Sequence, residues 1–321
     1  MSVVVPTYKR AALLDRCLTA LVEQDFDRCG FEIVVADDAD SPDTRCQVTE
    51  WASAYICRGP QIRYVTSCAG RGPASARNAG WQAARGNIIA FTDDDCIPEP
   101  GWLSAGGRAF RPGDAALAGR VVVPPVDRPT DYEKNASLLA SAGFVTASCF
   151  IRREILEQLG GFDPRFAVAW REDSDLIFRL IERGYRIGTA PDAVVVHPVR
   201  PAPWGVSLRQ QRKSSYNALL YRKHPTLYRQ RIQSAPPWRY YGIVGAMLAT
   251  IVAMLTGRRR SARLAALLWV ILSGQFCIER LRGTSHAPKH VAEMVVTSAL
   301  IPPLAIFWRI RGAVRFRVPF L

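Results

Sequence analysis

The sequence predicts an α/β protein in which helices sandwich a mostly parallel sheet, followed by a basic, hydrophobic helical region. Two observations lead to this fold class. In residues 1–203, short apolar runs of strand length alternate with segments of helical period, as in βαβ units. Residues 198–321 hold 20 of the 42 Lys and Arg residues but only two of the 28 Asp and Glu residues, together with long apolar runs. At 321 residues, the chain is also too long for one typical core.

Four strands and the helices between them are expected before residue 98. The strands are short runs rich in Val and Ile, and the helices carry apolar residues at helical spacing. Alternating strands and helices pack as a parallel sheet covered by helices. The expected order is strand Ser2–Val5, a helix through Leu13–Val22, strand Phe31–Ala36, helix 43–55, strand Gln61–Thr66, a helix opened by Gly70-Arg71-Gly72-Pro73, and strand Ile88–Phe91.

The second half of the α/β part is less regular. Acidic residues in a first turn and a glycine just after the last turn mark its best-signalled helix, which begins near Glu172 and ends at Gly184. The other expected elements are a short helical piece from Gly101, strands Ala115–Val123 and Phe144–Ile151, helix Arg153–Leu159 ended by Gly160-Gly161, and strand Val194–Val196 followed by His197.

Three consecutive carboxylates, Asp93, Asp94 and Asp95, directly follow the strand Ile88–Phe91. Such carboxylates repel one another unless something neutralises them, and divalent cations prefer oxygen ligands. A solvated acidic turn is the alternative for an isolated triplet. Two other carboxylate clusters, in residues 37–43 and 172–175, lie where strand ends are expected, and open α/β sheets bind ligands at the carboxyl ends of their strands. The triplet therefore indicates a metal and phosphate site.

The helix that begins near Glu172 places its two first carboxylates on different faces. Asp173 shares a stripe with Leu176, Ile177 and Leu180, so we expect Asp173 at the top of the buried face. Glu172 is rotated about 100° away from it. The alternative is that both are simply acidic residues that the helix dipole favours at an N-terminus.

Other protein classes fit the sequence less well. Dehydrogenases share the strand–helix pattern, but their G-x-G-x-x-G fingerprint is missing, because the first loop, Pro6–Arg10, contains no glycine. The chain begins within its first predicted strand and shows no signal-peptide pattern there. There is no C-x-x-C pair and no zinc-like Cys/His spacing, which favours reduced thiols in a reducing compartment for the eight cysteines, at positions 17, 29, 46, 57, 68, 96, 149 and 277.

Six motifs occur in an order that resembles one known family. They are Val-Val-Val-Pro-Thr-Tyr-Lys-Arg (3–10), Glu-Ile-Val-Val-Ala-Asp-Asp (32–38), Ala-Arg-Asn-Ala-Gly (76–80), Phe-Thr-Asp-Asp-Asp (91–95), Gly-Gly-Phe-Asp-Pro-Arg-Phe (160–166) and Arg-Glu-Asp-Ser-Asp-Leu (171–176). The set resembles family 2 glycosyltransferases of the GT-A fold over about residues 1–200. One difference is that Asp37-Asp38-Ala39-Asp40-Ser41 stands where Asp-Asp-Gly-Ser is commoner.

The resemblance implies a nucleotide-sugar site at the strand ends. Arg77 is expected beside the diphosphate, because its fixed fork of donors suits phosphate oxygens; an ordinary surface arginine is the alternative. Asp37 would accept a hydrogen bond from the base, with Asp38 as second choice. The donor-binding set is Pro6, Thr7, Tyr8, Arg10, Asp37, Asp38, Arg77, Asp93 and Asp94.

The resemblance also implies a metal ion and a catalytic base. The D-x-D motif maps onto Asp93 and Asp95, with Asp95 as direct ligand, and His197 matches a histidine that often completes the metal site; a structural histidine is the alternative. The ion, Mn²⁺ or Mg²⁺, would neutralise charge on the leaving nucleoside diphosphate. Family members of this kind invert the anomeric carbon. Asp173 is our choice for the base that deprotonates the acceptor hydroxyl, with Glu172 in reserve.

The last third of the chain predicts contact with a membrane. Residues 204–239 interleave eight Lys and Arg residues with Trp and Tyr and contain no acidic residue, which suits an anionic bilayer surface. Single-stranded nucleic acid could stack on the same aromatics, but the adjacent apolar runs disfavour it, so no nucleic-acid partner is expected. These runs are Tyr240–Leu255, Leu264–Ile278 and Val291–Trp308. Arginine clusters flank them, so we expect at least one run to be re-entrant or interfacial.

The sequence thus predicts a catalytic domain (1–203), a basic and aromatic interfacial linker (204–239) and membrane-associated helices (240–321). The predicted function is an inverting, metal-dependent glycosyltransferase on the cytoplasmic side of the membrane. It would move a sugar, of the hexosyl type, from a nucleotide-diphosphate sugar to a lipid-linked or polysaccharide acceptor. Two alternatives stay open: a nucleotidyltransferase-like enzyme on the same scaffold, and a non-catalytic membrane-anchored sugar-nucleotide-binding module.

Overall fold

The structure is a computed structural model that describes residues 1–57, 59–67 and 72–320. It forms two compact units. The first comprises Met1–Pro124 and Ser137–Val199, and the second comprises Pro125–Ala136 and Arg200–Leu321. The expected Gly70-Arg71 helix opening and Cys68 lie outside the described residues.

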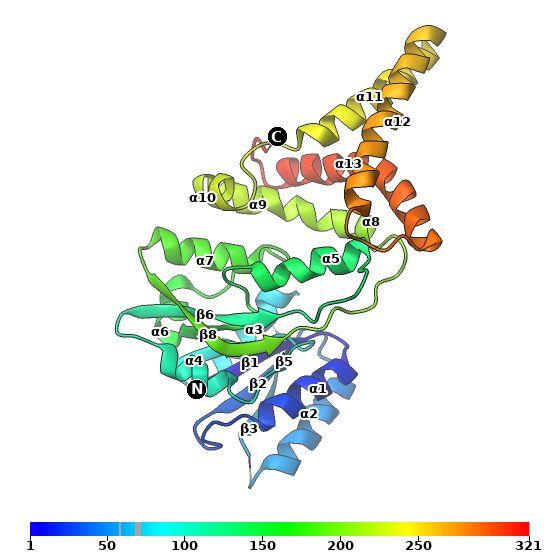
Figure 1. Cartoon of the computed structure of the whole chain (residues 1–321). Coiled ribbons are helices and arrows are strands. Elements are labelled where there is room, and N and C mark those ends of the chain that lie inside the picture. Colours follow the sequence, from blue (N-terminus) through cyan, green and yellow to red (C-terminus); the bar gives the residue numbers. More distant parts are fainter. Residues whose placement is uncertain (58, 68–71, 321) are drawn as a thin grey trace. The chain divides into compact units, whose positions relative to one another are not determined.

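The first unit is built on an eight-stranded mixed sheet (Figure 1). Four of its seven neighbouring strand pairs are parallel and three are antiparallel. The strand order is β3-β2-β1-β4-β7-β6-β8-β5. The strands are β1 (Ser2–Thr7), β2 (Glu32–Asp37), β3 (Gln61–Thr66), β4 (Ile88–Phe91), β5 (Ile97–Pro98), β6 (Asp114–Val122), β7 (Cys149–Arg152) and β8 (Arg186–Val196).

The sheet is buried on both faces because helices cover each of them, and successive side chains of its central strands point to opposite faces. Val3 and Val5 of β1 pack with helices α1 (Ala11–Val22), α2 (Pro42–Tyr55) and α4 (Trp102–Ala109). Val4 packs with α3 (Pro73–Ala83), α6 (Arg153–Leu159) and α7 (Glu172–Glu182) on the other face. The predicted helix–sheet–helix sandwich is therefore confirmed, with a sheet that is mixed.

Two strands begin at residues far from the predicted ones. Strand β8, expected at Val194–Val196, begins already at Arg186. The strand expected at Phe144–Ile151 begins only at Cys149, because a turn joins the Ser148 N–H to the Val145 carbonyl, 3.2 Å apart. This strand, β7, runs antiparallel to both of its neighbours, β4 and β6. The alternation of strands and helices predicted that this strand would be parallel to its neighbours. That pattern carries no signal for a strand whose direction is reversed.

The second unit consists of helices and contains the membrane-type segments. Most of the short helix α5 (Asp131–Ser137), from the excursion that follows β6, belongs to this unit, whereas the 3-10 turn after it (Leu138–Ser141) belongs to the first unit. The remaining elements are α8 (Val206–Gln210), a 3-10 turn (Gln211–Ser214), α9 (Ser215–Lys223), α10 (Pro225–Arg231), α11 (Trp238–Leu255), α12 (Arg259–Leu281) and α13 (Pro288–Arg315).

Three of these helices, α11, α12 and α13, are long and apolar enough to cross a membrane. The run Leu264–Ile278, too short by itself, joins its flanks into the 23-residue α12, so its length does not exclude a crossing. Helix α13 continues through Pro302 and Pro303.

A buried ion pair ties helix α5 to the membrane-type helices. The Arg280 guanidinium of α12 donates to Asp131 Oδ2 at 2.8 Å and to Thr297 Oγ1 of α13 at 2.7 Å. No local sequence signal marks Asp131, because its partner lies 149 positions away.

Candidate active site

The predicted site residues come together because of strand direction. Strands β1, β2, β4 and β8 all run the same way through the sheet, so the loops after them emerge at one edge. These loops carry Tyr8 to Arg10, Asp37 to Ser41, Asp93 to Asp95, and His197. The expected cluster at the carboxyl ends of the strands is present.

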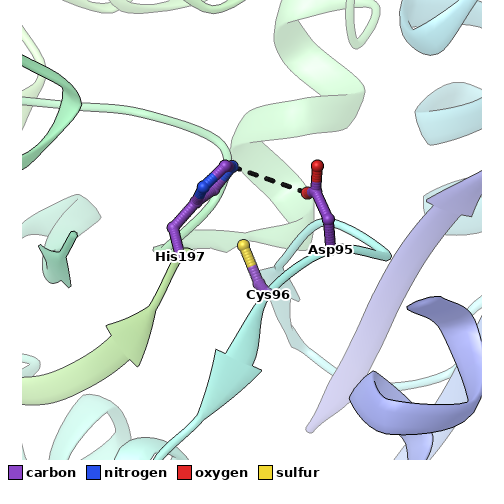
Figure 2. A group of neighbouring side chains, drawn as sticks. All are labelled: Asp95, Cys96 and His197. Carbon is purple, nitrogen blue, oxygen red and sulfur yellow. Dashed lines mark ion pairs between the residues drawn. The ribbon is translucent and has the colours of Figure 1, made fainter. Parts of the chain in front are cut away.

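Asp95 and His197 face each other at this edge. The Nε2 atom of His197 lies 3.5 Å from Oδ1 of Asp95 (Figure 2). Cys96 lies beside them, and one ligand atom from each of the three residues lies within 4.8 Å of the other two. A carboxylate and an imidazole are suitable ligands for a divalent ion. The pair therefore fits the metal site that the sequence predicted. Cys96 was not among the predicted ligands.

Cys96 is a buried thiol that lies among carboxylates. The side chain is buried, and burial raises its pKa well above the ordinary value, with Asp93 and Asp95 adding to the shift. The Cys96 N–H donates to the Asp93 carbonyl at 3.1 Å, which closes a tight turn through the carboxylate triplet. The sequence signal was available, since the cysteine directly follows the triplet.

Asp94 is used to anchor the first loop. Its Oδ2 accepts a hydrogen bond from Thr7 Oγ1 at 2.8 Å, and its Oδ1 accepts one from Arg10 Nη1 at 3.0 Å. Burial raises the pKa of Asp94, although Arg10 and Thr7 act in the opposite direction. Asp94 is only 2% exposed, so its two hydrogen bonds hold Thr7 and Arg10 from the protein interior. Tyr8, beside them, is exposed.

Asp37 has a comparable role in the second loop. It is fully buried, its Oδ1 accepts from the Ala39 N–H at 2.9 Å, and its Oδ2 accepts from the Ser41 N–H at 2.7 Å and from the Tyr64 hydroxyl at 3.0 Å. The expected hydrogen bond from a base N–H to Asp37 stays a prediction, and three protein donors already bind this carboxylate. Asp38, the second choice, is partly exposed, and its Oδ1 accepts from the Gly72 N–H at 2.7 Å.

Arg77 is buried between two carboxylates. Its Nη2 lies 2.7 Å from Asp93 Oδ1, and its Nη1 lies 3.0 Å from Glu172 Oε1. Burial alone would lower the pKa of Arg77, but Asp93 and Glu172 together raise it above its usual value. The residue is 3% exposed, so Arg77 is not an ordinary surface arginine, and its place beside the diphosphate stays a prediction.

The motif that contains Arg77 explains why the helix lies where it does. Asn78 donates through Nδ2 to the Phe162 carbonyl at 2.7 Å and accepts from the Phe162 N–H at 2.8 Å, which fixes α3 against the loop after α6. Gly80 allows α3 to approach β1, since a Cβ there would lie 2.4 Å from Val4 Cγ1. The Arg77 guanidinium lies over the Phe162 ring, 5.7 Å from its centroid.

The two candidate bases occupy different environments. Glu172 is the buried one, and burial raises its pKa to about 7, against the attraction of Arg77. Asp173 is half-buried, and its Oδ1 accepts from the Ser174 N–H at 2.6 Å. The prediction that Asp173 tops the buried face was wrong, because Glu172 and Asp175 occupy the inner side of this first turn. Asp173 is consequently the more accessible carboxylate.

The fold and this site define a glycosyltransferase of the GT-A fold. The family model "Glycosyl transferase family 2" matches residues 2–162, just over half of the chain, and the model "Glycosyl transferase family group 2" matches residues 131–278. The chain therefore belongs to the family 2 glycosyltransferases.

Two curated relatives agree with this assignment. Glycosyltransferase AglE of Haloferax volcanii is 26% identical over 221 residues, which is 66% of this chain and 70% of AglE. The pre-mycofactocin glycosyltransferase of Mycobacterium tuberculosis is 29% identical over 289 residues, which is 81% of this chain. The chain spans only 57% of that second relative.

Solved structures show the same fold. The mannosyltransferase PcManGT of Pyrobaculum calidifontis, solved with GDP-Man and Mn²⁺, superposes with a TM-score of 0.56 at 24% identity, covering 98% of this chain and 86% of that one. Residues 1–349 of Staphylococcus aureus TarS, solved with UDP-GlcNAc, give a TM-score of 0.50 at 16% identity, covering 98% and 89%.

Proposed function

We propose that this glycosyltransferase transfers a sugar from a nucleotide-diphosphate sugar, with inversion, to a lipid-linked or polysaccharide acceptor at the cytoplasmic face of a membrane. The observation that carries the proposal is the Asp95–His197 pair at the carboxyl ends of β4 and β8, 3.5 Å apart. The ligands of the two similar structures, GDP-Man with Mn²⁺ and UDP-GlcNAc, support a nucleotide-sugar donor.

Asp95 and His197 would hold a Mn²⁺ or Mg²⁺ ion. The fit rests on chemistry, since a carboxylate oxygen and an imidazole nitrogen at this separation can share one ion, and diphosphate oxygens would supply further hard ligands. Such an ion supplies charge neutralisation to the leaving nucleoside diphosphate. Asp93 contributes indirectly, because its carboxylate is paired with Arg77.

The first loop would hold the nucleoside. Pro6 and Thr7 end the buried strand β1, while Tyr8 is exposed and offers a ring on which a base can stack. Arg10 is partly exposed, and its Nη1 lies 3.9 Å from Oδ2 of the proposed metal ligand Asp95. The Arg10 guanidinium would therefore also reach the donor phosphates. Asp38 is better placed than the buried Asp37 to accept a hydrogen bond from the base.

Asp173 would act as the base. An inverting transfer needs one carboxylate that accepts the proton of the attacking acceptor hydroxyl while the nucleoside diphosphate departs from the opposite side. Asp173 is half-buried and accessible, whereas Oε1 of Glu172 is occupied by Arg77. Glu172 is therefore proposed as the residue that orients Arg77 and the start of α7.

The second unit would bind the anionic membrane. Its long helices expose rather than bury their apolar windows, with only 11% of the window in α11 buried among the described residues. Lipid is the natural cover for such surfaces, and the basic and aromatic residues of the 204–239 segment suit the headgroup region.

Family membership favours this proposal over the two alternatives. A nucleotidyltransferase needs a cationic grip on a triphosphate, and the first loop offers only Lys9 and the Asp94-bound Arg10. A non-catalytic binding module has no use for an accessible carboxylate such as Asp173 beside the donor site.

The test is a screen of the purified full chain, in detergent, for release of nucleoside diphosphate from a panel of nucleotide sugars with Mn²⁺. At least one donor should be turned over, and EDTA should stop the release. Asp192→Ala, which removes an exposed carboxylate of β8, serves as a control that should behave like the wild type. If pyrophosphate were released from nucleoside triphosphates instead, the nucleotidyltransferase alternative would hold.

A further inference from the structure

The side chain of Cys96 points to the same side as that of its neighbour Asp95. In a strand, the side chains of neighbouring residues alternate between faces. Here the turn closed by the Cys96 N–H and the Asp93 carbonyl, 3.1 Å apart, lies between β4 and β5, so Asp95 and Cys96 both face His197. Figure 2 shows the three side chains converging from two chain segments that are about one hundred residues apart in sequence.

The separations suit a single small ion. One ligand atom each from Asp95, Cys96 and His197 lies within 4.8 Å of the others. On tetrahedral zinc, ligand bonds are about 2.0–2.3 Å long, so two ligand atoms of one ion lie about 3.3–3.8 Å apart. Side-chain adjustments of about 1 Å or less would bring all three onto one ion.

We propose that Asp95, Cys96 and His197 form a three-ligand site for a thiophilic divalent ion of the Zn²⁺ class, in competition with the Mn²⁺ or Mg²⁺ ion of the donor site. Thiolate and imidazole favour zinc-like ions, whereas Mn²⁺ and Mg²⁺ prefer carboxylate, water and phosphate oxygens. The proposal rests on the proposed function only in that Asp95 and His197 also belong to the donor-ion site.

Occupancy by the thiophilic ion excludes the activating ion. Coordination moves the Cys96 Sγ proton to solvent and forms one metal–sulfur bond, and the same ion takes the atoms of Asp95 and His197 that Mn²⁺ requires. The burial of Cys96, at 1% exposed, and of Asp95, at 8%, keeps bulk water from two of the three ligands. Zn²⁺ should therefore inhibit donor turnover by displacement.

The experiment uses Co²⁺ as a spectroscopic stand-in for Zn²⁺ on the purified, tag-free full chain. Thiolate ligation should give a sulfur-to-cobalt charge-transfer absorption that saturates at one ion per chain and disappears when Zn²⁺ is added. Cys96→Ser should lose the band and weaken Zn²⁺ binding by at least about 10-fold relative to Mn²⁺ binding. Cys277→Ser, which changes a buried thiol of the second unit, should keep it.

The outcomes separate the two proposals. If Mn²⁺ binds, measured by calorimetry, but Co²⁺ gives no thiolate band, the role of Cys96 is overturned while the donor-ion site stands. A band that persists in Cys96→Ser assigns the thiolate to another cysteine and also overturns the inference. If neither Mn²⁺ nor Co²⁺ binds in the presence of a nucleotide sugar, the metal-dependent function fails as well. A second variant, Cys96→Ala, gives the same readout should the serine fail to fold.

Discussion

Arg77 and Glu172 form a buried ion pair between two helices that are 95 residues apart in sequence. The Nη1 atom of Arg77 lies 3.0 Å from Oε1 of Glu172, and both side chains are at most 5% exposed. The other terminal nitrogen of Arg77 holds Asp93 at 2.7 Å. Since burying charges costs desolvation free energy, removing one partner of such a pair is more harmful than its net contribution suggests. The pair therefore couples the start of α7 to the loop that carries the carboxylate triplet.

The raised pKa of Glu172 predicts a pH-dependent stability. Burial raises this pKa from 4.5 to about 7, so between these values the folded chain keeps a proton that the unfolded chain has released. Stability from the protonated form is fully present below about pH 4.5 and is lost as the pH rises through about 7. Glu172→Gln cannot ionise and lacks this loss. The thermal midpoint of Glu172→Gln minus that of the wild type, both measured in detergent, should therefore increase as the pH is raised from 5 to 8.

The control for this measurement is Glu154→Gln, which changes an exposed glutamate of α6. Its thermal midpoint should differ from that of the wild type by the same amount at pH 5 and at pH 8. A difference between Glu172→Gln and the wild type that stays constant across the range would contradict the assignment of a raised pKa to Glu172.

The roles of the two carboxylates in α7 show where sequence reasoning reached its limit. The acidic first turn and Gly184 located this helix, observed at Glu172–Glu182, and periodicity found its apolar stripe, because Leu176 and Leu180 belong to the core. It could not show that Arg77 of α3 would turn Glu172 inward, since that contact depends on how two distant helices pack. The same applies to Asp37 and Asp94, whose buried hydrogen bonds are made with residues of neighbouring loops.

Asp173→Asn should lower turnover by about 10²–10⁴-fold with little change in donor affinity. The amide keeps the shape of the side chain and its hydrogen bonding but cannot take the proton of the acceptor. Turnover is measured as nucleoside diphosphate release with acceptor, and donor affinity by calorimetry. Ser174→Ala, which changes the neighbour whose hydroxyl lies 3.3 Å from Asp173 Oδ1, is the matched control. Near-normal turnover in Asp173→Asn together with a loss in Glu172→Gln would exchange the two roles.

Asp95→Ala should abolish metal-dependent donor binding while the fold is retained. The residue lies at the end of the loop after β4 and belongs to neither large apolar cluster of the sheet, so its loss removes a ligand and leaves those clusters intact. Calorimetry with and without Mn²⁺ measures the effect, and circular dichroism checks the fold. Asp192→Ala again provides the control. Unchanged donor affinity in Asp95→Ala would rule Asp95 out as a metal ligand.

The elements of the fold were predictable where local signals were strong. Strands β3 and β4 and helix α6 have the predicted ends, the last because Gly160 ends α6 with a left-handed backbone (φ 73°). Elements specified by distant partners were missed or misplaced. Strand β5 exists only through its pairing of Ile97 and Pro98 with β8, and helix α5 is held by the Asp131–Arg280 pair.

The helices of the second unit pose a question of topology. If α11, α12 and α13 all crossed the membrane with the catalytic unit in the cytoplasm, the arginine clusters at 258–263 and 309–317 would lie outside. The tendency of basic loops to stay in the cytoplasm opposes that arrangement. Length does not decide the matter, because these helices have 18, 23 and 28 residues and a crossing takes about 20, with a lower limit near 17.

We therefore expect at least one of these helices to be re-entrant or interfacial, which would keep the segment Arg258–Arg263 in the cytoplasm. A cysteine introduced as Ser261→Cys, probed in intact cells with a membrane-impermeant thiol reagent, should stay unlabelled until the cells are permeabilised. Ser261 is exposed, so access within the protein is not limiting. The wild type, with exposed thiols at Cys29, Cys46 and Cys57, is the control, and its labelling in intact cells would contradict a cytoplasmic catalytic unit. Ready labelling of Ser261→Cys alone would show that α11 crosses in full and that charge did not determine the topology.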